Sequence, residues 1–243
     1  MSVTAGQGWT TTMRGRSGER MVTAYPPLYT MPDAAAALDG EGDRTRLLIR
    51  TAYDLLDESG LEGLTIRAVL ARAGLARRAF YERFQGKDDL VLAVFDSSLR
   101  AAALQFREIT GQCDGPVEAL RSIVTGIVVG QLGQDRMGAN RRGAALSREH
   151  LRLAQTRPAE LNSALEPLLD LIAGHVGEGM AGGVFRQADA QLQARLIYNL
   201  VSTTVHTVLL AEEEGVADRT VDRTGREELA NELWDFCRRA IVA

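Results

Sequence analysis

Six side chains in residues 61–90 are the candidates to donate hydrogen bonds to the phosphates and bases of a nucleic acid. They are Thr65, Arg67, Arg77, Arg78, Tyr81 and Lys87. Hydroxyl, guanidinium and ammonium groups are the donors that proteins use to hold a phosphate backbone, and arginine also recognises base edges in the major groove. The set therefore predicts a DNA-binding surface.

Two short helical patterns separated by Gly74 would position these donors. Thr65 can cap the first helix, and glycine permits a sharp reversal after it. The apolar residues of the first helix fall on one face, and those of the second can supply its buried side. They are Ile66, Val69, Leu70 and Ala73 in the first, and Leu75, Phe80 and Phe84 in the second. This arrangement predicts a helix-turn-helix whose Arg77, Arg78, Tyr81 and Arg83 face outward.

Longer helices are predicted on both sides of this motif. Residues 43–59 place Leu48, Ala52, Leu55 and Leu56 at helical spacing, with Gly60 just after the end. This helix would pack across the two short ones and complete a three-helix core. After Lys87, a pattern that starts with acidic residues continues as one long connecting helix.

The motif resembles the tetracycline-repressor-like (TetR) family of bacterial transcription regulators. The residues that carry the resemblance are Thr65, Ala73, Gly74, Tyr81, Phe84, Lys87, Asp88, Asp89 and Leu90. The resemblance implies that Thr65, Tyr81 and Lys87 donate to phosphates, although Thr65 could be only a helix cap, Tyr81 a cover for the core edge and Lys87 a solvated side chain. It also implies that the C-terminal helices form a dimer interface and a ligand chamber, and that ligand binding weakens DNA affinity.

The start of the second short helix departs from the family pattern. Ala76 stands where the family commonly has Ser or Thr, Arg78 where a small residue is frequent, and Ala79 where Thr is frequent. Alanine is a poor N-cap, so a cap and a phosphate contact are both expected to be missing here. This departure bears on which DNA sequence is bound more than on DNA binding itself.

Composition favours an all-α protein. Aromatic residues make up only 5% of the 243, and the apolar content is rich in Ala and Leu. The net charge is −4, but residues 43–90 hold nine Lys and Arg against eight Asp and Glu, a net charge of +1. Such a weakly basic motif favours a shaped, specific contact over tight non-specific binding.

Several other functional classes are not favoured. Cys113 and Cys237 lie far apart without metal-ligand spacing, so we expect neither a disulfide framework nor a metal site. No phosphate-binding glycine loop or nucleophile motif is present, so we expect no enzyme and no cofactor. No stretch is long and apolar enough to cross a bilayer, which predicts a soluble cytoplasmic protein without a membrane partner.

The chain is expected to comprise three parts. Residues 1–42 read as a disordered extension, in which Arg14, Arg16 and Arg20 could follow a DNA minor groove as an arm. Residues 43–90 form the helix-turn-helix domain. Residues 91–243 form a larger helical domain for ligand binding and dimerisation, with helical patterns at 116–132, 148–155, 159–176, 189–214 and 225–242 and a polar loop before the last.

The larger domain suggests two partners besides double-stranded DNA with a palindromic operator. Apolar faces on the last two helices could build a four-helix bundle across a two-fold axis in a homodimer, although a monomer could bury the same faces. They comprise Leu192, Leu196, Leu200 and Val208, then Leu229, Leu233, Phe236 and Ala240.

A hydrophobic or amphipathic effector of unknown identity is the other expected partner. Five side chains could border its chamber, each with the alternative of a surface or satisfied core position. They are His150, His175, Tyr198, His206 and Trp234. The sequence therefore predicts a repressor that a small effector releases from DNA. The alternatives are a DNA-binding protein without an effector, or an activator.

Overall fold

The computed structural model describes residues 41–132, 141–214 and 223–243, and in these residues it is all-α. No β-strand occurs there, only an isolated antiparallel bridge between Phe185 and Val242. The helices are α1 (Glu41–Gly63), α2 (Ile66–Ala73), α3 (Arg77–Tyr81), α4 (Lys87–Thr110), α5 (Pro116–Leu132), α6 (Arg141–Thr156), α7 (Pro158–Ala181), α8 (Ala190–Glu213) and α9 (Arg223–Ile241). The predicted fold class is thus confirmed.

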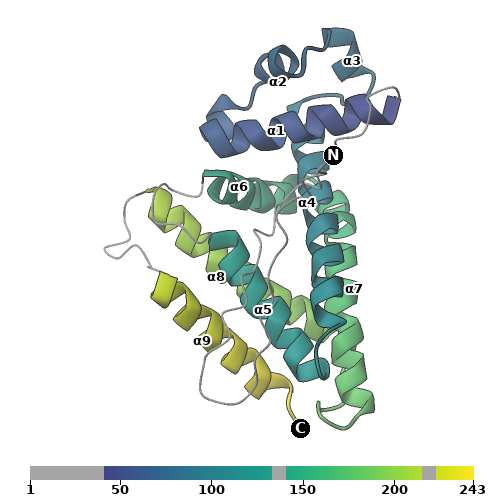
Figure 1. The fold of residues 1–243 in the computed structure, drawn as a ribbon, viewed down its shortest axis with the longest axis vertical. Coiled ribbons are helices and arrows are strands. Elements are labelled where there is room, and N and C mark those ends of the chain that lie inside the picture. Colours follow the sequence, from purple (N-terminus) through teal and green to yellow (C-terminus); the bar gives the residue numbers. More distant parts are fainter. Residues whose placement is uncertain (1–40, 133–140, 215–222) are drawn as a thin grey trace, which may run out of the picture.

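Helices α1, α2 and α3 form an N-terminal unit at one end of the molecule (Figure 1). The predicted first helix is confirmed, and its Leu48, Ala52 and Leu56 are fully buried. Gly60 interrupts α1 with φ +62°, a left-handed conformation that only glycine adopts readily. The chain arm expected at Arg14, Arg16 and Arg20 lies outside the described residues.

Local capping determines the helix-turn-helix as the sequence predicts. The backbone amide of Ala68 donates to Oγ1 of Thr65 at 3.1 Å, which satisfies one of the free amides at the start of α2. Gly74 ends α2 in the left-handed conformation, with φ +65°. Phe80 and Phe84 are buried beneath the exposed face of α3. By contrast, Ala76 occupies the N-cap position of α3 and makes no side-chain hydrogen bond there, as expected for alanine.

Helix α4 runs from the N-terminal unit along the larger part of the molecule (Figure 1). It packs against α7 and α5, while α5 also packs against α9, and α7 against α8. Helix α6 lies beneath α1 in Figure 1 and contacts both α1 and α8. A single apolar core extends through all these contacts. Helix α6 therefore lies between the N-terminal unit and the interior of the larger part.

Helices α6 and α7 are longer than the apolar pattern predicts, as is α1, which continues past Gly60 to Gly63. Helix α6 begins at Arg141 rather than at residue 148, because Ala144, Ala145 and Leu146 are buried although they form no obvious stripe with the residues after them. Helix α7 continues past Val176 to Ala181 through glycines that sequence reading treats as a helix end. A Cβ on Gly179 would lie only 2.0 Å from Cδ2 of Phe185, so the glycine allows this ring to pack onto the helix.

Candidate nucleic-acid interface and interior site

The six predicted donors lie at one end of the molecule, on α2, α3 and the first turn of α4. Five of them, Thr65, Arg67, Arg77, Arg78 and Tyr81, have exposed side chains, and Lys87 is half-buried. The hydroxyl of Thr65 uses its oxygen as acceptor in the cap, so its hydrogen remains available to a phosphate. The geometry can therefore present several donors to one DNA backbone.

Two cations of this face, Arg77 and Arg78, already have partners within the protein. Arg77 lies over the Tyr81 ring, 5.4 Å from its centroid, and its Nη2 is 3.4 Å from the Tyr81 hydroxyl. Arg78 forms an ion pair with Glu82 at 2.8 Å, one helical turn away. A phosphate would have to compete with Glu82 for Arg78, whereas Arg77 and Tyr81 can act together.

Lys87 has a structural bond that sequence reading does not reveal. Its Nζ donates to the carbonyl oxygen of Leu61 at 2.9 Å, just after the interruption of α1 at Gly60. This bond ties the start of α4 to the end of α1. An ammonium group has three donors, so the same side chain can still reach a phosphate.

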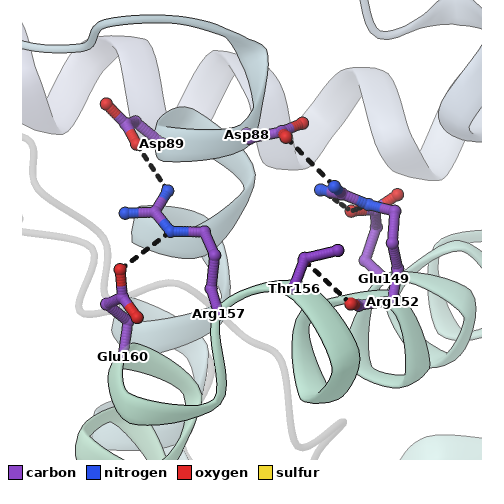
Figure 2. Close-up of polar contacts among 7 residues, drawn as sticks. All are labelled: Asp88, Asp89, Glu149, Arg152, Thr156, Arg157 and Glu160. Carbon is purple, nitrogen blue, oxygen red and sulfur yellow. Dashed lines mark hydrogen bonds and ion pairs between the residues drawn. The ribbon is translucent and has the colours of Figure 1, made fainter.

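Two arginines connect the start of α4 with the larger part of the molecule (Figure 2). Nη1 of Arg152, on α6, lies 3.0 Å from Oδ2 of Asp88, and its Nη2 lies 2.7 Å from Oε2 of Glu149. Arg157, between α6 and α7, contacts Asp89 at 2.5 Å and Glu160 at 3.0 Å. Each arginine thus holds one acidic residue of α4 and one of its own region.

Asp89 also binds the turn that follows α3. Its Oδ2 accepts a hydrogen bond from the backbone amide of Gln85 at 2.9 Å. This amide, and then the guanidinium of Arg157, lower the pKa of Asp89 below its ordinary value of 3.8. The carboxylate therefore stays ionised at neutral pH, and it links the turn after α3 to the α6–α7 corner.

A third arginine ties the beginning of α6 to α1. Arg142 lies over the Tyr53 ring, 4.4 Å from its centroid, and its Nη1 is 3.1 Å from Oδ1 of Asp57. Together with Arg152 and Arg157 it attaches α6 and its C-terminal corner to α1 and α4 at three points. We call Arg142, Arg152 and Arg157 the bridging arginines.

Sequence reasoning missed the bridging arginines as functional candidates. The contacts to Asp88 and Asp89 join residues 64 and 68 positions apart, and no local pattern announces such pairs. The acidic pair itself is visible in the sequence, as part of the family resemblance. Its partners become visible only once α6 is placed against α4.

Three of the five predicted chamber residues meet in the interior. The ring of His150 on α6 lies 4.9 Å from that of His206 and 6.5 Å from that of Tyr198, both on α8, as measured between centroids. Phe95 of α4, which sequence reading did not single out, lies 5.5 Å from His150. We call Phe95, His150, Tyr198 and His206 the interior ring cluster.

The other two predicted chamber residues lie elsewhere. His175 on α7 bonds through Nδ1 to Glu178 at 3.0 Å, on its own helix. Trp234 is buried on α9 and lines an open cleft of about 850 Å³, to which Arg121, Val184 and Arg238 also contribute. This cleft lies beside α5 and α9 and does not include the interior ring cluster.

The apolar faces predicted for dimerisation are only partly exposed. Leu192, Leu196 and Phe236 are exposed, with 52%, 54% and 61% of their surface accessible. Leu233 is buried, while Leu200, Val208 and Leu229 pack against the chain's own core. The exposed part of α8 and α9 is therefore narrower than the predicted stripe.

Neither a metal site nor a membrane span occurs among the described residues. Among the described residues, no group of three or more His, Cys, Asp or Glu side chains is placed to hold a metal ion. None of the helices formed by these residues has the length and apolar character needed to span a membrane.

Comparison with known proteins supports the interpretation of the N-terminal unit. Residues 48–94 match the model of bacterial regulatory proteins of the tetR family. No curated protein matches the sequence significantly. The match covers α1 from Leu48, all of α2 and α3, and the first turns of α4.

Solved structures share the fold over most of the chain. One is the transcriptional regulator FadR from Bacillus subtilis in complex with stearoyl-CoA, with a TM-score of 0.62 and 18% identity over 79% of this chain and 96% of that one. RolR in complex with resorcinol has a TM-score of 0.60 and 15% identity over 83% and 88%. A TetR transcription regulator from Haloarcula marismortui has a TM-score of 0.60 and 19% identity over 83% and 100%.

The helix-turn-helix match and the shared all-α fold point to the same kind of protein. The interior ring cluster and the bridging arginines do not contribute to this comparison. The N-terminal unit of this chain matches the model of the tetR family of bacterial regulatory proteins over residues 48–94, and the chain as a whole shares the all-α fold of the solved regulators.

Proposed function

We propose that the protein is a homodimeric transcriptional repressor that a small hydrophobic or amphipathic effector releases from a palindromic operator. The observation that carries the proposal is the exposed set of donors on α2 and α3, with Lys87 beside it, on a rigid capped helix-turn-helix. Phosphate contacts of this kind position a recognition helix, and arginine at its start can reach base edges. Such a protein acts in the cytoplasm and needs no catalytic group.

Dimerisation is part of the proposal, because one short helix-turn-helix makes few base contacts and dimers read two half-sites. The exposed apolar side chains Leu192, Leu196 and Phe236 on α8 and α9 support it. Burying them against a second copy would remove large apolar groups from water.

Release by an effector is supported by the position of α6. This helix contributes His150 to the interior ring cluster and Arg142 and Arg152 to the contacts with the N-terminal unit. A ligand that binds the interior and changes the preferred position of α6 would change the placement of α1 and α4. The effector needs only to bind one position of α6 more tightly than the other, because this difference in affinity shifts the equilibrium between the two positions.

The solved neighbours support a ligand of this general kind. FadR from Bacillus subtilis was solved with stearoyl-CoA and RolR with resorcinol, so proteins of this fold hold both a long acyl chain and a small ring. We propose the interior of α4, α6 and α8 as the corresponding region here, and a division of the chain near residue 90 between DNA binding and regulation.

A gel-shift assay with DNA from beside the protein's own gene tests the proposal. We expect a retarded complex of a protein dimer at low salt, which an added effector weakens. A folded dimer that binds none of this DNA at low salt would contradict the proposal. A DNA-binding protein without an effector, or an activator, is the alternative.

Thermal unfolding across a library of hydrophobic metabolites distinguishes an effector-controlled repressor from a DNA-binding protein without an effector. A specific ligand raises the apparent stability by mass action. Transcription from the bound promoter distinguishes a repressor from an activator, because a repressor lowers it and an activator raises it.

A further inference from the structure

Two of the protein's three histidines lie side by side in the interior, on different helices. His150 belongs to α6 and His206 to α8, and only 6% of the surface of His206 is accessible. The rings of Phe95 and Tyr198 adjoin His150. Histidine pairs are unusual in a helical core that could be filled with aliphatic side chains.

One atom of this cluster lacks a partner. Nδ1 of His150 is shielded from solvent and makes no hydrogen bond within the described part of the protein. Buried polar atoms nearly always have a hydrogen-bond partner, because water would otherwise have satisfied them. The missing partner is therefore expected to come from outside the chain.

The charge state of the pair limits what that partner can be. Burial lowers the pKa of His150 to about 4, and burial together with the charge of His150 lowers that of His206 to about 3. Both rings are thus uncharged at neutral pH, each with one nitrogen that donates and one that accepts. The neighbouring carboxylate of Glu149 is already paired with Arg152.

An ionic ligand would be poorly matched to this environment. A cation would find no unpaired carboxylate among the cluster residues. A carboxylate would be buried without a cationic partner, because burial keeps both imidazoles uncharged. A hydroxyl group needs neither, because it can donate to or accept from an uncharged imidazole nitrogen.

We infer that the interior ring cluster binds an uncharged, ring-containing molecule whose hydroxyl group hydrogen-bonds to Nδ1 of His150. The ring of the ligand packs against Phe95 and Tyr198, where aromatic edges and faces favour flat apolar partners. The inference rests on the proposed function, since it names the chemical class of its effector.

The test compares phenol, toluene and benzoate as probes of the full-length protein at pH 7.5. Phenol and toluene share ring and size, so their difference isolates the hydroxyl, whereas benzoate adds the charge. Dissociation constants come from the rise in unfolding temperature with probe concentration. We expect phenol to bind at least about tenfold more tightly than toluene. We expect benzoate to bind more weakly than phenol.

Three substitutions at one position locate the hydrogen bond. His150→Phe keeps a ring but removes both nitrogens, so the phenol preference should fall to near one. His150→Asn retains a polar group near the Nδ1 position and should keep part of the preference. His150→Gln, which places its amide one carbon further out, should lose it. Circular dichroism verifies that each variant is folded. If His150→Phe does not fold, the comparison of His150→Asn with His150→Gln still tests the hydrogen bond.

His175→Phe is the matched control, because it makes the same change at the histidine that lies outside the cluster. It should leave the phenol preference unchanged. Equal binding of phenol and toluene, tighter binding of benzoate, no binding of phenol, or a preference that survives in His150→Phe would each overturn the inference.

Gel shifts on the same samples separate this inference from the proposed function. Operator binding without any phenol preference would refute the ligand class alone. A His150-dependent phenol preference in a protein that binds no operator DNA would refute the repressor function alone.

Discussion

The carboxylate of Asp89 lies 2.5 Å from the guanidinium of Arg157 and accepts a hydrogen bond from the backbone amide of Gln85. One side chain of α4 thus contacts both the turn after the recognition helix and the corner between α6 and α7. Beside it, Asp88 and Arg152 make a parallel contact (Figure 2). These pairs therefore connect the turn after α3 with the larger part of the molecule through polar contacts.

Replacing both Arg152 and Arg157 by Gln should weaken the response to effector more than it weakens folding. Partly exposed ion pairs contribute only about 0–1 kcal/mol each to stability, so the fold should survive. The effector-induced loss of DNA affinity, measured by fluorescence anisotropy, should shrink. Arg100→Gln is the control, because its partner Asp96 belongs to the same helix. An unchanged effector response in the double variant would contradict the proposed role.

The two helix starts of the motif should respond oppositely to substitution. Thr65→Ala removes an observed N-cap and should lower the free energy of unfolding by about 0.5–2 kcal/mol. Ala76→Ser supplies a cap that α3 lacks and should raise it by up to about 1 kcal/mol. Urea unfolding followed by circular dichroism measures both. If Ala76→Ser leaves the free energy of unfolding unchanged or lowers it, a side-chain cap at position 76 does not stabilise α3.

Glu82 should restrain DNA binding through its ion pair with Arg78. Glu82→Gln frees the guanidinium and removes a negative charge near the phosphates, so affinity should rise. It should also become more salt-dependent, with the logarithmic slope steeper by about 0.9 if Arg78 gains one phosphate contact. Glu108→Gln, at the far end of α4, makes the same change away from the interface. Equal slopes for the two variants would exclude the competition.

Stability should fall between pH 7 and pH 5 because of His150 and His206. Their folded pKa values, about 4 and about 3, lie below the unfolded value of 6.5, so the unfolded chain binds more protons in this window. The stabilisation is present above pH 6.5 and is lost as the pH falls towards the folded values. At pH 5 the loss should be about 2 kcal/mol for each ring.

Urea unfolding at the two pH values measures this loss, and a variant with both histidines replaced by Phe should lose correspondingly less. An identical pH dependence in the native protein and the double variant would mean that the rings are not buried uncharged.

Charge placed on the exposed apolar face of α8 and α9 should dissociate the proposed dimer. Leu196→Asp or Phe236→Asp introduces a carboxylate that an interface would have to desolvate. Sedimentation should show monomers, and operator affinity should fall at least about tenfold because one reading head remains per molecule. Leu104→Asp is the matched control, since Leu104 is equally exposed on α4. A dimer that persists in both α8 and α9 variants would place the interface elsewhere.

Local sequence signals predicted the helix-turn-helix because its determinants are local. The cap at Thr65, the left-handed turn at Gly74 and the interruption at Gly60 each depend on one residue and its neighbours. The missing side-chain cap at Ala76 could likewise be predicted from the sequence, because alanine has no hydrogen-bonding side chain. Propensity and capping act within one helical turn, so the sequence alone contains the information.

The interior site was only partly predictable because it depends on how distant helices pack. His150 and His206 are separated by 55 intervening residues, and their meeting requires α6 to lie against α8. The same three-histidine list included His175, whose partner is one turn away on its own helix. Trp234 has the size and polarity of a chamber residue, yet it lies beside the outer cleft. Residue type suggested candidates, and only packing could separate them.

The contact between Gly179 and Phe185 sets a condition on how this sequence can change over evolutionary time. The phenyl ring occupies the space that any Cβ at position 179 would need. A larger residue there is tolerable only if position 185 becomes smaller in the same lineage. Homologues should therefore show the two positions varying together, with glycine retained wherever the aromatic ring is retained.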